Sequence, residues 1–225
     1  MALTFIFIPL MTKHPLWSED YWILLLQLYL RKPVGVKPLY SKPLVDLSLE
    51  LHIPPQFLHS QLFQLRSAAT PHLKRLLDLY ANNPSKLQRD IRRLKQMSGF
   101  CSGGTFFEGV AVNAPFEKDF LPLPSYPALK PVMLLMILNL YYQLTPITMV
   151  KETPEVAELA KRMKIKPELV VEVLLAYQNI DPYLRNKPEV DDALLQPCKD
   201  MWRRYGYDSP EQLETIAAQM KDYFQ

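Results

Sequence analysis

The sequence predicts an all-α protein built from two tandem, sequence-related helical repeats. Proline occurs 21 times among the 225 residues and glycine only 6 times, and proline without glycine suits helices that begin on proline. An all-β chain would need turn glycines every 8–12 residues or so, and they are absent. The third observation is a weak self-similarity between the chain and itself 112 positions further on, which is the mark of an internal repeat.

The self-similarity aligns residues 21–66 with residues 133–178. Its identities are Leu26/Leu138, Leu28/Leu140, Tyr29/Tyr141, Leu47/Leu159, Ile53/Ile165, Pro55/Pro167 and Leu62/Leu174. The match resumes downstream with a larger shift, where Pro84 aligns with Pro210 and Leu87 with Leu213. The change of shift indicates an insertion in the second copy.

These matches divide the chain into four parts. Residues 1–17 form an N-terminal extension, residues 18–97 repeat 1, residues 98–127 an inter-repeat segment and residues 128–225 repeat 2. The first residues of the extension are apolar, but they have no basic stretch or cleavage pattern of a signal peptide and are too short to span a membrane.

Each repeat predicts the same succession of helices. Those expected in repeat 1 cover residues 19–31, 44–51, 55–66, 71–81 and 84–97, and those in repeat 2 cover residues 129–144, 155–163, 167–179, 191–205 and 210–224. The first helix of each repeat is apolar on most sides, which predicts burial. We expect these two helices to pack together in a shared interior, with a pseudo-two-fold relation between the repeats.

The inter-repeat segment is predicted to be irregular and aromatic-rich, with a short strand at residues 110–112. A flexible linker would not be so aromatic, so we expect the segment to lie across both repeats. Its aromatic side chains are Phe106, Phe107, Phe116, Phe120 and Tyr126. Packing in the core is the favoured role for them, and a ligand-binding role is the alternative.

Each repeat contains a short helix, a tight turn and a second helix with a distinctive residue pattern. Repeat 2 has the small residue Ala160 before the turn, and repeat 1 has Ser48. The apolar positions that follow are Ile165, Val170 and Val173 in repeat 2, and Ile53 and Leu58 in repeat 1, where Gln61 replaces the last. This pattern resembles the helix-turn-helix superfamily, although His52 and Lys164 stand where that family has a turn glycine.

The resemblance implies that the second helix of the unit would read bases. Repeat 1 supplies the polar candidates for this role: Gln56, His59, Ser60, Gln64 and Arg66. A basic stripe on its last predicted helix would meet phosphates: Lys86, Arg89, Arg92, Arg93 and Lys95. In repeat 2, Glu168 and Glu172 would repel phosphate. Tri-helical cores also serve as protein-interaction units.

The charge distribution agrees with this difference between the repeats. Residues 1–100 carry 13 Lys and Arg against 6 Asp and Glu, a net charge of +7, whereas residues 151–225 carry 11 against 14, a net charge of −3. A basic first half suits nucleic acid or an acidic partner. The alternatives are that the basic stripe is an ordinary solvated helix face, or that it packs against the acidic second repeat.

No catalytic, metal or cofactor site is predicted. The glycines are not placed between a strand and a helix, as a phosphate-binding loop requires. The four histidines are scattered, and no pair has the i, i+4 spacing of helical metal ligands. Cys101 and Cys198 fit neither a disulfide framework nor a metal knuckle, which suggests a reducing compartment.

The resulting functional hypothesis is a non-catalytic, cytoplasmic protein-interaction or scaffold protein with a protein partner. The alternative is a nucleic-acid-binding or regulatory protein acting through repeat 1, and a remote alternative is an enzyme of unknown chemistry. The apolar runs at residues 21–30 and 132–144 are shorter than the roughly 20 residues of a membrane helix, so no membrane span is predicted. The sequence predicts neither the identity of the partner nor the oligomeric state.

Overall fold

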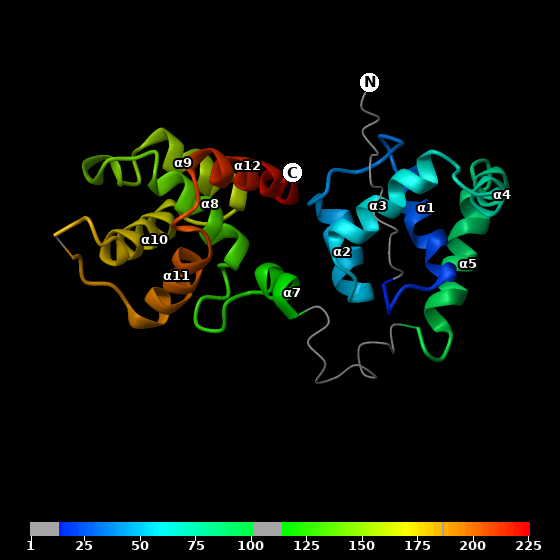
Figure 1. Cartoon of the computed structure of the whole chain (residues 1–225), viewed down its shortest axis with the longest axis horizontal. Coiled ribbons are helices and arrows are strands. Elements are labelled where there is room, and N and C mark those ends of the chain that lie inside the picture. Colours follow the sequence, from blue (N-terminus) through cyan, green and yellow to red (C-terminus); the bar gives the residue numbers. More distant parts are fainter. Residues whose placement is uncertain (1–13, 101–113, 186) are drawn as a thin grey trace, which may run out of the picture.

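The computed structural model describes residues 14–100, 114–185 and 187–225. These residues form helices, turns and loops, and none of them lies in a strand. The predicted strand at residues 110–112, together with Phe106 and Phe107, falls outside them. Two helical lobes lie side by side (Figure 1). We call residues 14–100 the first lobe and the described residues from 114 onward the second lobe.

The helices follow the predicted order in both lobes. The first lobe contains η1 (Glu19–Tyr21), α1 (Trp22–Leu30), α2 (Lys42–Leu51), α3 (Pro55–Arg66), α4 (Pro71–Tyr80) and α5 (Pro84–Gln96). The second lobe contains α7 (Ala114–Phe120), α8 (Pro131–Tyr141), η2 (Pro146–Thr148), α9 (Pro154–Met163), α10 (Pro167–Ile180), α11 (Asp192–Tyr205), α12 (Pro210–Met220) and η3 (Lys221–Phe224). The prediction of an all-α chain is confirmed.

Most of these helices begin on proline, whose fixed φ suits a first helical turn and whose missing N–H group is not needed there. Ser18, Thr70, Asp191 and Ser209 cap helices by accepting hydrogen bonds from backbone N–H groups. Asn83, directly before α5, behaves differently, because its side-chain amide donates to the carbonyl of Leu79 instead.

The α2–α3 and α9–α10 turns have the same backbone geometry. His52 has φ 55° and ψ 34°, and Lys164 has φ 58° and ψ 40°. Both are left-handed, a conformation that favours glycine because it carries no Cβ. In each turn the next residue, Ile53 or Ile165, donates its N–H group over 3.1 Å to a carbonyl five residues back. A hydrogen bond of this kind satisfies a carbonyl group that has no intrahelical partner at the C-terminus of a helix.

Each lobe has a hydrophobic core of its own. In the first lobe, α1 contributes Leu25 and Leu26, which are fully buried among side chains of α2 to α5. In the second lobe, α8 lies at the centre of a separate core and packs against α9 to α12. The expectation that the two apolar helices share one interior is therefore wrong. Each of them is enclosed by the shorter helices of its own lobe instead.

The prediction that residues 98–127 are irregular is also wrong in part, because α7 lies within this segment. Phe116 and Phe120 are four residues apart and therefore lie on one face of α7. Phe120 is buried in the core of the second lobe, with its ring centroid 5.1 Å from that of Tyr223 and 6.2 Å from that of Tyr40. Burial of this face favours a helix where the sequence suggested an extended chain.

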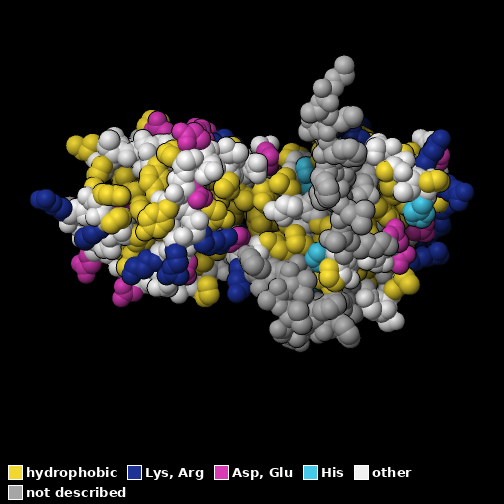
Figure 2. Space-filling view, in the orientation of Figure 1, with side chains coloured by type: hydrophobic (Ala, Val, Ile, Leu, Met, Phe, Trp, Pro, Cys, Tyr) yellow, Lys and Arg dark blue, Asp and Glu magenta, His cyan; other side chains and the backbone are white. Residues whose placement is uncertain are grey.

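The lobes meet along one face of α2. Val45 is fully buried in the core of the second lobe, and Leu49 packs beside it. Hydrophobic side chains also gather along the line where the two lobes meet in the space-filling view (Figure 2). In the sequence match, the counterparts of Val45 and Leu49 are Ala157 and Lys161, and both of these are exposed. Only the first lobe carries this apolar face, so the contact is not a symmetric two-fold one.

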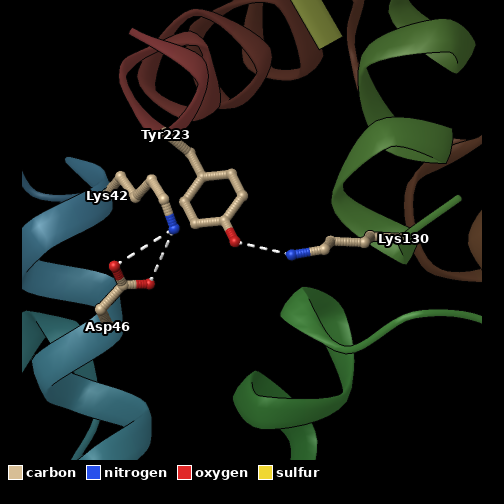
Figure 3. A network of polar contacts seen from close by, with 4 residues as sticks. All are labelled: Lys42, Asp46, Lys130 and Tyr223. Atoms are coloured by element: carbon tan, nitrogen blue, oxygen red, sulfur yellow. Dashed lines mark hydrogen bonds and ion pairs between the residues drawn. The ribbon is translucent and has the colours of Figure 1, made fainter. Parts of the chain in front are cut away.

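Polar contacts around Tyr223 border the same interface (Figure 3). Lys130 of the second lobe donates to the Tyr223 hydroxyl over 2.8 Å. Lys42 of α2 lies 5.7 Å from the centroid of the Tyr223 ring and forms an ion pair with Asp46 at 3.2 Å. His52 of the first lobe and Glu117 of α7 make a further contact, with 3.0 Å between Nδ1 and Oε1. The C-terminal segment and α7 therefore anchor the second lobe on α2.

Candidate functional site

The polar residues that the sequence predicts to read bases all lie on α3, and several already have partners. The Gln56 amide donates to the Tyr40 hydroxyl over 2.8 Å, and the Ser60 hydroxyl donates to the Phe57 carbonyl over 2.6 Å. His59 stands edge-on to Phe63 at a centroid distance of 5.1 Å. Burial lowers the pKa of His59 from 6.5, an effect that a hydrogen bond to the backbone of Lys37 partly offsets.

The basic stripe lies on the outer face of α5, because Leu87, Ile91 and Leu94 turn the opposite face into the core. Lys and Arg side chains gather at the end of the molecule where α4 and α5 lie, with acidic side chains close by (Figures 1 and 2). Since α1 packs against both α3 and α5, it lies between the two predicted nucleic-acid-binding sets.

Several cations of the stripe have partners within the first lobe itself. Asp90 lies 3.7 Å from Arg89 and 4.0 Å from Arg93, and Lys95 forms an ion pair with Glu50 of α2. Lys86 lies 5.7 Å from the centroid of the Tyr80 ring. None of these partners belongs to the acidic second repeat, so the ion pairs of the stripe are local.

The first lobe has a groove between α1, α2 and α5, with a volume of about 570 Å³. Its floor contains Leu24, Leu28 and Leu87, which are 3%, 7% and 4% exposed. Val34, in the loop after α1, lies at the groove and is 61% exposed. We call this the α1–α2–α5 groove. No pattern in the sequence predicted this groove.

A second, smaller cavity of about 150 Å³ lies in the second lobe between α8, α9 and α12. Its residues on α8 and α9, with Gln143 just after α8, are the counterparts, 112 positions later, of residues that line the first groove. The matched pairs are Leu24/Met136, Gln27/Asn139, Leu28/Leu140, Arg31/Gln143, Pro43/Glu155, Asp46/Glu158, Leu47/Leu159 and Glu50/Arg162. Lys95 and Lys221 also line the two cavities and differ by 126 positions, the shift of the downstream match between Pro84 and Pro210.

Some charged side chains at the α1–α2–α5 groove have ion-pair partners among the described residues, and one does not. Asp46 pairs with Lys42 and Glu50 with Lys95, so both carboxylates of α2 are matched. Arg31, at the end of α1, forms no ion pair with any residue that the structure describes. The unmatched charge at this groove is therefore positive.

The second lobe contains buried polar groups that serve packing. Tyr177 is fully buried and donates its hydroxyl to the Leu134 carbonyl over 2.9 Å, and Tyr141 donates to Asp181 over 2.7 Å. The Cys198 thiol is fully buried, and burial raises its pKa to about 12. A thiol with so high a pKa is not a nucleophile at neutral pH. Within the described ranges, no group of three or more His, Cys, Asp or Glu could hold a metal ion.

No helix in the described part of the chain is both long and apolar enough to cross a membrane. Comparison of the chain with family models, curated proteins and solved structures gave no match. The α1–α2–α5 groove and the basic face of α5 are two surfaces from which a function can be argued.

Proposed function

We propose that this chain is a non-catalytic protein-interaction module whose α1–α2–α5 groove receives a segment of a partner protein. The observation that carries the proposal is the groove itself, about 570 Å³ in volume with a leucine floor and a charged rim. An apolar groove between helices is one of the recurring kinds of site at which proteins bind a segment of a partner. Its charged side chains Asp46, Glu50 and Lys95 are already ion-paired, which suits recognition better than acid–base chemistry.

The matched cavity in the second lobe supports a duplicated, helix-turn-helix-like origin for the two lobes. On this proposal the first lobe has kept an open groove, whereas the corresponding cavity of the second lobe has become smaller. The second lobe instead contributes the surface against which α2 packs. The groove lies next to the contact between the lobes, because α2 lines the groove and also packs against the second lobe. A partner bound in the groove would leave the other surfaces of this chain accessible, which is what a scaffold role requires.

The proposal is tested by differential capture. The double variant Gln27→Glu/Val34→Glu places two charges at the groove, on residues that are both exposed. The matched control Ile147→Glu/Gln219→Glu adds the same charge at exposed sites outside both cavities. We expect a protein captured from extract by the unaltered chain to be lost with the groove variant and retained with the control. Equal capture by both variants would show that the captured protein does not bind in the groove.

A second candidate function is nucleic-acid binding through α5, and one observation favours it. Arg89, Arg92 and Arg93 are all exposed on the outer face of α5, and Arg92 forms no ion pair within the described residues. Changing these three residues to Ala should abolish a salt-dependent gel shift of duplex DNA. The control changes Lys161, Lys164 and Lys166 of the second lobe to Ala. If the unaltered chain shifts no duplex at low salt, this candidate fails.

A further inference from the structure

The charge around the α1–α2–α5 groove restricts what can occupy it. Residues 14–100 carry 12 Lys and Arg against 6 Asp and Glu, a net charge of +6. The two groove carboxylates are matched by lysines, whereas Arg31 has no acidic partner among the described residues. A partner with negative charge would be attracted by the field of the lobe and would meet Arg31 directly.

The groove walls restrict the form of that partner as well. The walls are helices, and the described residues offer no strand edge to which an extended peptide could add. Leu24 and Leu28 are four residues apart on α1 and form one row on the floor. A groove of this kind takes an amphipathic helix, whose apolar side chains recur at three- and four-residue spacing.

The counterpart cavity shows which features are particular to the first lobe. Gln143 stands in place of Arg31, and Glu155 stands in place of Pro43. The volume falls from about 570 Å³ to about 150 Å³. In the second lobe an acidic helix would therefore meet a glutamine in place of Arg31 and a glutamate in place of Pro43, and it would lose most of its space.

We propose that the α1–α2–α5 groove binds an acidic amphipathic helix of a partner protein. Apolar side chains of that helix pack over the floor at Leu24 and Leu28 and against the exposed Val34, and one of its carboxylates pairs with Arg31. This inference rests on the proposed function and specifies its partner. The second lobe does not bind the same helix.

Three synthetic helical peptides of equal length and identical apolar positions provide the test. Their flanking positions carry Glu, Gln or Lys, and their affinity for the full chain is measured by fluorescence anisotropy at low and at physiological salt. We expect the Glu peptide to bind about tenfold more tightly than the Lys peptide at low salt, with a smaller ratio at physiological salt because solvent ions screen exposed charges.

Variants of the full chain test whether Arg31 is responsible for the preference for the Glu peptide. Arg31→Gln copies the residue of the second lobe and should remove most of the preference for Glu, and Arg31→Glu should reverse it. Arg75→Glu, an exposed arginine on α4 outside the groove, serves as the matched control and should change the affinity by less than about twofold.

Two results would overturn the inference. One is equal or tighter binding of the Lys peptide, and the other is an equal effect of Arg31→Glu and Arg75→Glu. If none of the peptides binds, the acidic-helix inference also fails, and the capture experiment then decides whether the groove receives a protein at all. A partner captured through the groove whose contacting segment is basic or extended would leave the proposed function intact and remove only this inference.

Discussion

His52 and Lys164, 112 positions apart in the chain, hold the same left-handed backbone conformation at the turns of the two lobes, with φ of 55° and 58°. Neither turn has the glycine that this conformation favours. The two residues differ in their surroundings, because His52 contacts Glu117 of α7 whereas Lys164 is exposed. This difference makes the pair a direct probe of the contact between the lobes.

Replacing Lys164 by Gly should stabilise the protein by about 0.5–1 kcal/mol, because glycine adopts the left-handed region without steric cost. The change His52→Gly should gain less or lose stability, because it also removes the contact with Glu117 at 3.0 Å. Urea unfolding of the two variants and of Glu117→Gln gives the comparison. An equal gain at both positions would mean that the His52–Glu117 contact contributes nothing.

The variant Val45→Asp should uncouple the lobes, because it places an unpaired charge at a fully buried position in the interface. We expect a loss of about 3 kcal/mol or more and a calorimetric transition that separates into two, one for each lobe. Ala157→Asp, at the exposed counterpart position, should change the stability by less than about 0.5 kcal/mol. A single transition of unchanged midpoint in Val45→Asp would contradict the interface described here.

The depressed pKa of His59 predicts a pH effect on stability. Burial lowers the pKa of this imidazole below 6.5 in the folded chain, so the unfolded chain binds more protons near pH 6. Stability should therefore fall as the pH drops from about 6.5 through the folded pKa. The variant His59→Gln should weaken this dependence. The proton NMR titration of His59 measures the pKa directly, and a midpoint at or above 6.5 would contradict the prediction.

The Cys198 thiol should resist alkylation in the folded protein. It is fully buried in the core of the second lobe, and its pKa is raised to about 12. In a Cys101→Ser background, reaction with iodoacetamide at pH 8 should therefore follow the rate of unfolding. Urea at a concentration that unfolds the chain supplies the fully reactive reference. Rapid labelling of the folded chain would show that the core around α11 opens easily.

The sequence predicted the helices well because their signals are local. Proline at helix starts and the matched apolar positions, such as Leu28 with Leu140, placed helices close to their observed bounds. The lobe contact was missed, because the buried Val45 and its exposed counterpart Ala157 both occur on ordinary amphipathic helices. Only the packing of α2 on the second lobe distinguishes them.

The groove was missed for a related reason. Its residues come from α1, α2 and α5, and their convergence depends on how these helices cross. A signal was nevertheless present, because Leu28/Leu140 and Leu47/Leu159 are identities of the repeat and also line the two cavities. The basic stripe was easier to see, since five Lys and Arg lie within residues 86–95. Its local pairing with Asp90 and Glu50 required the structure.

The proposed function requires that the groove of the first lobe receives a protein segment. Amide hydrogen exchange of the full chain, measured with and without the purified protein that the capture experiment yields, tests it most directly. We expect slower exchange in α1, α2 and α5, with exchange in α8, α9 and α12 unchanged. Slower exchange confined to α3, or confined to the helices around the cavity of the second lobe, would contradict it.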